Sequence, residues 1–142
     1  MSDKIYQVLF ICTQNSARSI LAEALLNQMG GGRFAAHSAG SHPRGSVHPL
    51  TLATLQRLRL PTDGLHSKDW APFAQPGAPA LDFVFTVCDN AAGEVCPVWP
   101  GQPVTAHWSL ENPAAVKGDD ATRRRAVQTA LQLLNRRISV FI

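Results

Sequence analysis

The sequence has little charge, and it lacks both a long apolar run and a leader-like start. Only 16% of its 142 residues are charged, and the formal net charge is +3. That excess is too small to argue for a nucleic-acid partner. No apolar stretch approaches the roughly 18 residues that a membrane-spanning helix needs, and no basic and apolar leader precedes the first expected strand. We therefore expect a soluble, cytoplasmic protein without nucleic-acid or membrane partners.

Cysteine is scarce and odd in number, which argues against a disulfide framework. The three cysteines are Cys12, Cys88 and Cys96, and structural disulfides are rare in a reducing cytosol. The spacing of Cys88 and Cys96 is not that of zinc ligands, and no histidine pair completes a metal-binding set. Catalysis, redox exchange and simple packing remain as roles for these thiols.

The remaining composition is that of one packed domain, expected to span residues 1–142, because 45% of the residues are hydrophobic. Strands of the buried type alternate with helical patterns, which predicts an α/β three-layer sandwich with a four-stranded parallel sheet flanked by helices. The expected strands are Ile5–Ile11, Phe34–Ser38, Asp82–Val87 and Val104–Trp108. The expected helices are residues 16–29, 48–60, 68–74 and a C-terminal amphipathic helix with an apolar stripe of Val127, Ala130, Leu131, Leu134, Ile138 and Phe141.

The segment CTQNSAR, from Cys12 to Arg18, follows the first expected strand and leads directly into a helix. Loops at the carboxyl ends of parallel strands are where such sheets bind ligands. Backbone N–H groups and the positive end of the helix would form an anion cradle here. The planar guanidinium of Arg18 suits two oxygens of a tetrahedral oxyanion. The predicted oxyanion-binding residues are Thr13, Gln14, Asn15, Ser16, Ala17 and Arg18.

The same electropositive loop would stabilise a thiolate on Cys12. The pKa of a free cysteine, about 8.5, falls to about 3.5–7.5 beside helix N-termini and basic groups. Cys12 is therefore predicted to be the nucleophile that attacks the bound oxyanion. Ser19, in the first helical turn, is expected to donate a hydrogen bond to the thiolate. Asn15 is a residue type that tolerates a left-handed backbone in a tight loop.

The loop resembles the signature loop of the low-molecular-weight protein tyrosine phosphatase superfamily, and the resemblance covers nearly the whole chain. It extends to the Ser-Ala-Gly stretch at 38–40 and to the pattern of residues 82–113. The resemblance implies a four-stranded parallel sheet with this loop after its first strand. Two enzyme classes share that fold, the phosphatases and the thiol-coupled arsenate reductases.

Residues 107–114, HWSLENPA, favour the reductase class. The phosphatases carry an Asp-Pro-Tyr-Tyr type of motif late in the chain, whereas the single tyrosine here, Tyr6, lies in the first expected strand. The stretch resembles the His-Trp-Gly-x-x-Asp-Pro-Ala stretch of arsenate reductases, with Asn112 where both classes usually have Asp. The possible acid position is therefore Asn112 or the adjacent Glu111, and of these Asn112, as an amide, can hydrogen-bond but has no proton to give at neutral pH.

The resemblance also implies a role for the other two cysteines. Cys88 follows the third expected strand, and Cys96 stands in the Pro- and Gly-rich loop after it. In the family's relay Cys12 forms a covalent adduct with arsenate, Cys88 attacks Cys12 as arsenite leaves, and Cys96 carries the disulfide outward. Thioredoxin, or glutathione with glutaredoxin, would then be the reductant.

Two alternatives stay open at this point. The chain could be a phosphatase that hydrolyses phosphomonoesters through Cys12 and Arg18, or a non-catalytic relative that only binds an oxyanion. Arsenate or phosphate is the ligand in each case. Some reductases of this type hold a potassium ion near the loop, and no other cofactor is implied. The positions that match this ion site are Asn15, Glu23, Ser38 and Asp69.

Several charged and histidine side chains carry weaker expectations. Asp119 and Asp120 stand at the expected positive end of the last helix, and Arg136 and Arg137 at its negative end. The residues expected to face solvent or to lie in loops are Arg123, Arg124, Arg125, His42, His48, His66 and His107.

Overall fold

The computed structural model describes residues 4–75, 77–87, 103–108 and 117–142. The elements in these ranges are, in chain order, β1 (Tyr6–Cys12), α1 (Arg18–Met29), β2 (Phe34–Gly40), α2 (Pro49–Arg57), α3 (Ala71–Ala74), β3 (Phe83–Thr86), β4 (Val104–His107) and α5 (Asp120–Phe141). The expected strands and the first three expected helices are present, with ends shifted by up to three residues. The sequence pattern therefore placed the elements correctly.

The strands form one parallel sheet in the order β2-β1-β3-β4. Strand β1 pairs with β2 on one side and β3 on the other, and Val8 through Ile11 are completely buried. Complete burial is what the nearly continuous apolar run in β1 predicts for a strand with both neighbours and both faces covered. The register pairs Cys12 with Gly40 and Ile11 with Thr86, so the carboxyl ends of these three strands meet at one edge.

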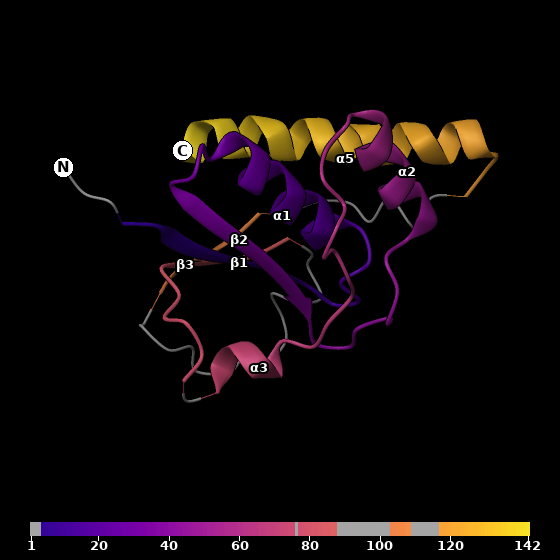
Figure 1. Ribbon diagram of the computed structural model, residues 1–142. Coiled ribbons are helices and arrows are strands. Elements are labelled where there is room, and N and C mark those ends of the chain that lie inside the picture. Colours follow the sequence, from indigo (N-terminus) through magenta and orange to yellow (C-terminus); the bar gives the residue numbers. More distant parts are fainter. Residues whose placement is uncertain (1–3, 76, 88–102, 109–116) are drawn as a thin grey trace.

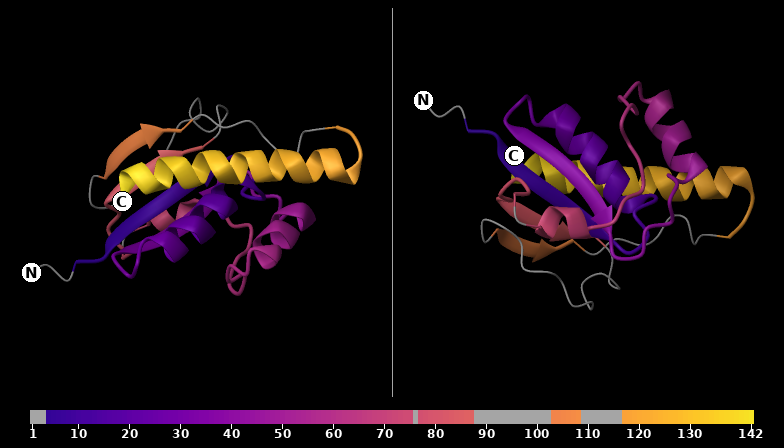
Figure 2. Two further views of the ribbon diagram at one scale, coloured as in Figure 1. Left: turned by 90° about the horizontal axis from the view of Figure 1, so that it is seen from above. Right: turned by 60° about the horizontal axis from the view of Figure 1, so that its bottom comes forward.

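Helices cover the two faces of this sheet (Figure 1). Helices α1 and α5 lie on one face with α2 beside them, and the short helix α3 lies on the other. Figure 2 shows α5 running past both α1 and α2. Helix α1 is therefore enclosed on most sides, which explains why apolar residues surround its axis instead of forming one stripe. Its buried residues are Ser19, Ile20, Leu21, Ala22, Ala24, Leu25 and Leu26.

The C-terminal helix α5 buries the predicted stripe and ends in an aromatic cluster. Phe141 is half-buried, and its ring centroid lies 4.9–6.2 Å from those of four other rings, Phe34, Phe83, Phe85 and Trp108. The fully or nearly fully buried stripe residues are Val127, Ala130, Leu131, Leu134 and Ile138. This stripe joins the long helix to the core that the strands and α1 form.

The charged residues expected at the two ends of α5 are found where predicted only at its N-terminal end. The Asp119 carboxylate accepts a hydrogen bond from the Thr122 N–H at 2.8 Å, and this bond holds the pKa of Asp119 below its ordinary value. The expected position of Arg136 and Arg137 at the negative end is wrong, because the helix continues to Phe141 and its last turn holds no basic residue. The apolar cluster around Phe141 accounts for that extra turn.

The outer face of α5 is exposed, as expected for Arg124 and Arg125. Arg123 differs, because it is half-buried and its Nη2 atom lies 3.5 Å from Nε2 of His48. In the part of the chain that the structure describes, no helix has the length and apolarity needed to cross a membrane.

Leu134 provides a test of the core. We expect Leu134→Ala to lower the free energy of unfolding by about 2–5 kcal/mol, because the fully buried side chain would leave a cavity. The exposed Gln132 lies two positions earlier, and Gln132→Ala is expected to change stability by less than about 0.5 kcal/mol. Urea unfolding followed by circular dichroism measures both. Equal losses in the two variants would contradict the placement of Leu134.

Candidate active site

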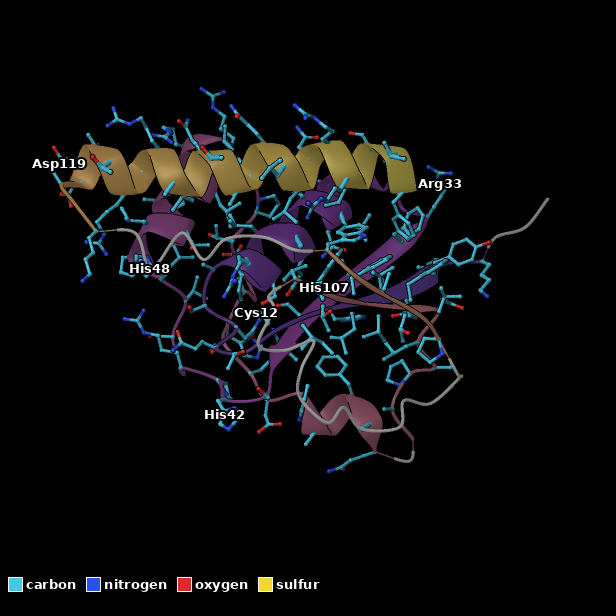
Figure 3. All side chains as sticks on the ribbon, turned by 180° about the vertical axis from the view of Figure 1, so that it is seen from behind. Cys12, Arg33, His42, His48, His107 and Asp119 are labelled. Carbon is cyan, nitrogen blue, oxygen red and sulfur yellow. The ribbon has the colours of Figure 1, made fainter. Side chains whose placement is uncertain are left out.

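The loop between β1 and α1 carries the predicted nucleophile and the predicted oxyanion ligands. Cys12 is the last residue of β1, is 3% exposed, and places its thiol in the interior of the molecule (Figure 3). Arg18 is the first residue of α1. The thiol and the guanidinium thus stand at the two ends of one loop, at the carboxyl edge of the sheet where ligands bind in such folds.

Three carbonyl groups of this loop accept hydrogen bonds from a neighbouring segment, residues 42–48. The N–H groups of His42, Arg44 and His48 donate to the carbonyl oxygens of Thr13, Gln14 and Ser16, each at 2.9 Å. A carbonyl oxygen that accepts a hydrogen bond from outside the loop does not point its partial negative charge at an anion inside the loop. The loop is therefore held in a shape suited to an anion by bonds that need no anion.

Asn15 fixes the middle of the loop, and the expectation of a left-handed backbone is confirmed by its φ of 48°. The side chain is completely buried and makes two hydrogen bonds. Its Nδ2 donates to Ser19 Oγ at 2.7 Å, and its Oδ1 accepts from the Lys68 backbone N–H at 2.9 Å. Because Ser19 Oγ accepts this bond, its own proton remains for another acceptor, and donation to the Cys12 thiolate stays a prediction.

The electrostatics at the start of α1 favour an anion. Its first turn holds no acidic residue, and Ala17 at the N-cap has no polar side chain to cap the exposed N–H groups. In contrast, α2 and α5 are capped by His48 and Asp119, whose side chains accept backbone N–H bonds. The partial positive charge at this helix end is therefore left uncompensated by any cap, which suits both an oxyanion and a thiolate.

Gly40 lets two backbone segments approach closely behind the loop. A Cβ atom at this position would lie 2.5 Å from the Thr13 carbonyl oxygen and 2.8 Å from that of Cys12. Its N–H donates to the Lys68 carbonyl at 2.9 Å, and its carbonyl accepts from the Trp70 N–H at 3.1 Å. Glycine is the residue that fits this close packing. In the sequence, this glycine stood out only as part of the Ser-Ala-Gly stretch that the family resemblance includes.

His48 is a site residue whose burial the sequence did not predict. We expected it to face solvent or to lie in a loop, but it is the N-cap residue of α2 and is 7% exposed, whereas His42, His66 and His107 are exposed. The His48 backbone N–H donates to the Ser16 carbonyl, and its Nδ1 accepts a hydrogen bond from the Leu50 N–H at 3.1 Å. Burial first, and then the positive charges of Arg44 and Arg123, hold the pKa of His48 below its ordinary value. A neutral ring suits the capping bond, which needs a lone pair on Nδ1.

The structure brings together two of the four candidate potassium ligands. Ser38 Oγ donates to Glu23 Oε1 at 2.5 Å. Asn15 instead directs its side-chain oxygen to the Lys68 N–H, and Asp69 Oδ1 accepts from the Ala71 N–H at 2.7 Å, at the start of α3. The ammonium of Lys68 lies 3.7 Å from Glu23 Oε1, a position that no periodicity or motif in the sequence indicated.

The remaining predicted residues, Cys88, Cys96, Glu111 and Asn112, lie outside the described residues. The chain can be followed to Val87, directly before Cys88. The Val87 N–H donates to the carbonyl oxygen of Ile11 at 2.9 Å, one residue before Cys12. Val87, the residue before Cys88 in the sequence, thus lies at the sheet edge that carries the Cys12 thiol.

Comparison with known proteins agrees with this geometry. A family model for low molecular weight phosphotyrosine protein phosphatase matches residues 7–138. The chain belongs to this family. The resemblance of the Cys12–Arg18 loop is thereby confirmed, and so is the expected α/β fold with its parallel four-stranded sheet.

Relatives within the family include arsenate reductases. An arsenate reductase of Oceanobacillus iheyensis is 30% identical over 145 residues, which cover 99% of this chain and 96% of that protein. The thioredoxin-dependent arsenate reductase Cg_ArsC1' of Corynebacterium glutamicum is 28% identical with a TM-score of 0.70, and the match covers 99% of this chain but 62% of that one. An arsenate reductase in its phosphate-binding state is 26% identical with a TM-score of 0.77, covering 96% of each chain.

Gly40→Ala tests the loop geometry. We expect phosphate to bind at least about tenfold more weakly, because a clash with two backbone oxygens costs roughly 1–3 kcal/mol and would displace the loop. Titration calorimetry with phosphate measures the loss, and Ser41→Ala at the next position is the matched control. Unchanged phosphate affinity in Gly40→Ala would show that the loop does not depend on this close approach.

Proposed function

We propose that the protein reduces arsenate to arsenite through a thiol relay that starts at Cys12. The observation that supports the proposal is the bond between the Val87 N–H and the Ile11 carbonyl, because Val87 lies beside the end of β1 and directly precedes Cys88 in the sequence. Neighbouring strands lie about 4.8 Å apart, and a disulfide needs Cα atoms roughly 4.4–6.8 Å apart. The relay therefore requires Cys88, which lies outside the described residues, to come within that distance of Cys12.

The first step uses the groups at the start of α1. Arg18 and the loop N–H groups bind three arsenate oxygens, and the Cys12 thiolate attacks arsenic. An S–As bond forms, and one arsenate oxygen leaves as water after it accepts protons. Asn112 and Glu111 remain the candidates for assisting that departure.

The second step transfers two electrons. The Cys88 thiolate attacks Sγ of Cys12, so an S–S bond forms and the S–As bond breaks. The bonding electron pair stays on arsenic, which leaves as arsenite, and the two thiols are oxidised to a disulfide. Cys96 then attacks Cys88, which regenerates the Cys12 thiolate and leaves a Cys88–Cys96 disulfide for a dithiol reductant.

Thioredoxin is the first candidate for that reductant, because the similar Corynebacterium protein is described as thioredoxin-dependent. Glutathione with glutaredoxin is the second, as the sequence resemblance implied. The two are separated by supplying each system alone to the same enzyme.

A phosphatase that acts on phosphomonoesters is the alternative function. The observation in its favour is that the loop, the uncapped helix end and Arg18 suit phosphate as well as arsenate. A phosphatase needs Cys12 and Arg18 but has no use for Cys88, so the two functions make different predictions for one substitution.

Cysteine substitutions decide between these functions. Cys12→Ser is expected to abolish both arsenate reduction and aryl phosphate hydrolysis, because it removes the nucleophile. Cys88→Ser is expected to abolish arsenate reduction and to leave any aryl phosphate hydrolysis intact. Cys96→Ser is the matched control. It is expected to release one arsenite per enzyme and then to stop, because the disulfide between Cys12 and Cys88 is not passed on. Arsenite release in the presence of each reductant system is the measurement.

Other outcomes would overturn the proposal. Continued multiple turnover of arsenate by Cys88→Ser would exclude the relay. Hydrolysis of aryl phosphate without arsenate reduction by the unmodified protein would identify a phosphatase, and binding of phosphate with neither activity would identify a non-catalytic relative.

Asn112→Asp tests the acid position. We expect the substitution to raise the rate of arsenate reduction by roughly tenfold or more, because it supplies a proton donor where the chain has an amide, and such donors contribute about 10² to 10⁴-fold. Glu111→Gln is the matched companion. A loss of rate in Glu111→Gln together with no gain in Asn112→Asp would assign the acid step to Glu111.

A further inference from the structure

Behind the oxyanion loop, an ammonium group lies among oxygen atoms from three segments. Nζ of Lys68 donates to the His66 carbonyl at 2.9 Å, lies 3.5 Å from Ser38 Oγ and is 3.7 Å from the Glu23 carboxylate. Carbonyl, hydroxyl and carboxylate oxygens are also the ligands that a potassium ion prefers. The ammonium thus has the surroundings of a bound monovalent cation.

These surroundings do not fit a potassium ion in addition to Lys68. The side chain of Glu23 is 13% exposed and that of Lys68 is 21% exposed, so solvent screens the pair weakly. A second cation against Glu23 would be repelled by the ammonium already there. Asp69, the other expected anionic ligand, is exposed and engaged with the Ala71 N–H.

The same residue also contacts the loop through its backbone. The Lys68 N–H donates to Asn15 Oδ1 and the Lys68 carbonyl accepts from the Gly40 N–H, each at 2.9 Å. The Lys68 side chain is anchored to Glu23 and Ser38, and the Lys68 backbone holds Asn15. The side-chain contacts therefore fix the segment that positions Asn15. Displacement of the ammonium would loosen a bond to the residue at the centre of the loop.

We propose that Lys68 is a built-in cation, which takes the place of a bound potassium ion and positions Asn15 in the oxyanion loop. The proposal holds whether the loop processes arsenate or phosphate. Lys68 acts through Asn15 and is thus a positioning residue.

Removal of the ammonium should create a requirement for a cation. Burial holds the pKa of Lys68 below its ordinary value, and the attraction of the Glu23 carboxylate opposes this shift. Without the ammonium, the nearly buried Glu23 carboxylate would keep only the hydroxyl of Ser38 among the partners that the described residues supply. An uncompensated charge of this kind destabilises a fold strongly, and a potassium ion from solution could then bind it.

The test is the melting temperature in potassium, sodium and choline chloride at equal ionic strength. We expect no difference between the salts for the unmodified protein. Lys68→Met should melt about 5 °C lower in choline chloride and regain at least half of that loss in potassium chloride. The double variant Glu23→Gln, Lys68→Met should show no response to potassium, because the carboxylate that would attract it is gone.

Lys4→Met is the matched control, because it removes an ammonium 2.9 Å from the Asp82 carboxylate in a more exposed ion pair. It should show no preference for potassium. Specific stabilisation of the unmodified protein by potassium, or a lack of any potassium response in Lys68→Met, would overturn the proposal.

A second measurement tests the link to Asn15. We expect Lys68→Met to bind phosphate about three- to tenfold more weakly in choline chloride, and potassium chloride to restore the affinity, because a less well-ordered loop binds its ligand less tightly. Unchanged phosphate affinity would exclude the positioning role. Neither measurement requires arsenate turnover, so failure of this proposal is distinguishable from failure of the proposed reductase function.

Discussion

An anion site built from backbone amides depends on a loop that keeps its shape before the anion arrives. In this protein the loop after β1 is held through its carbonyl oxygens, which accept hydrogen bonds from the 42–48 segment. Asn15, completely buried and in a left-handed conformation, links the same loop to α1 and to Lys68. Gly40 allows the strand beside it to approach. The positions of the predicted nucleophile Cys12, of the start of α1 and of the Arg18 guanidinium all depend on this one arrangement.

The electrostatics of the site follow from what surrounds that loop. Helix α1 begins without a polar cap or an acidic residue, so its positive end is available to an oxyanion and a thiolate. The single carboxylate on its next turn, Glu23, would oppose both, and the ammonium of Lys68 lies against it. The positive field at the loop is therefore preserved by a charge pair behind it. A cysteine in this field is expected to be reactive although it is nearly inaccessible.

Much of the fold was predictable because short-range patterns dominate it. Apolar runs identified the strands, the stripe from Val127 to Phe141 identified α5, and the residue preference of Asn identified the left-handed position in the loop. Errors arose where a distant contact overrode the local pattern. Helix α5 continues past Arg136 and Arg137 because Phe141 packs into an aromatic cluster, and His48 is buried because Arg123 and the loop enclose it.

The amino-acid sequence by itself determined the order of elements, the thiol and guanidinium at the two ends of one loop, and the membership of a phosphatase-like family. These are properties of adjacent residues, whose spacing along the chain sets their chemistry. Only the tertiary structure decided that Glu23, Ser38 and Lys68 share one cluster and that the Asp69 carboxylate instead accepts a hydrogen bond from the Ala71 N–H. Residues from a helix, a strand and a loop meet there, and no local preference specifies such a meeting because it results from the packing of the layers.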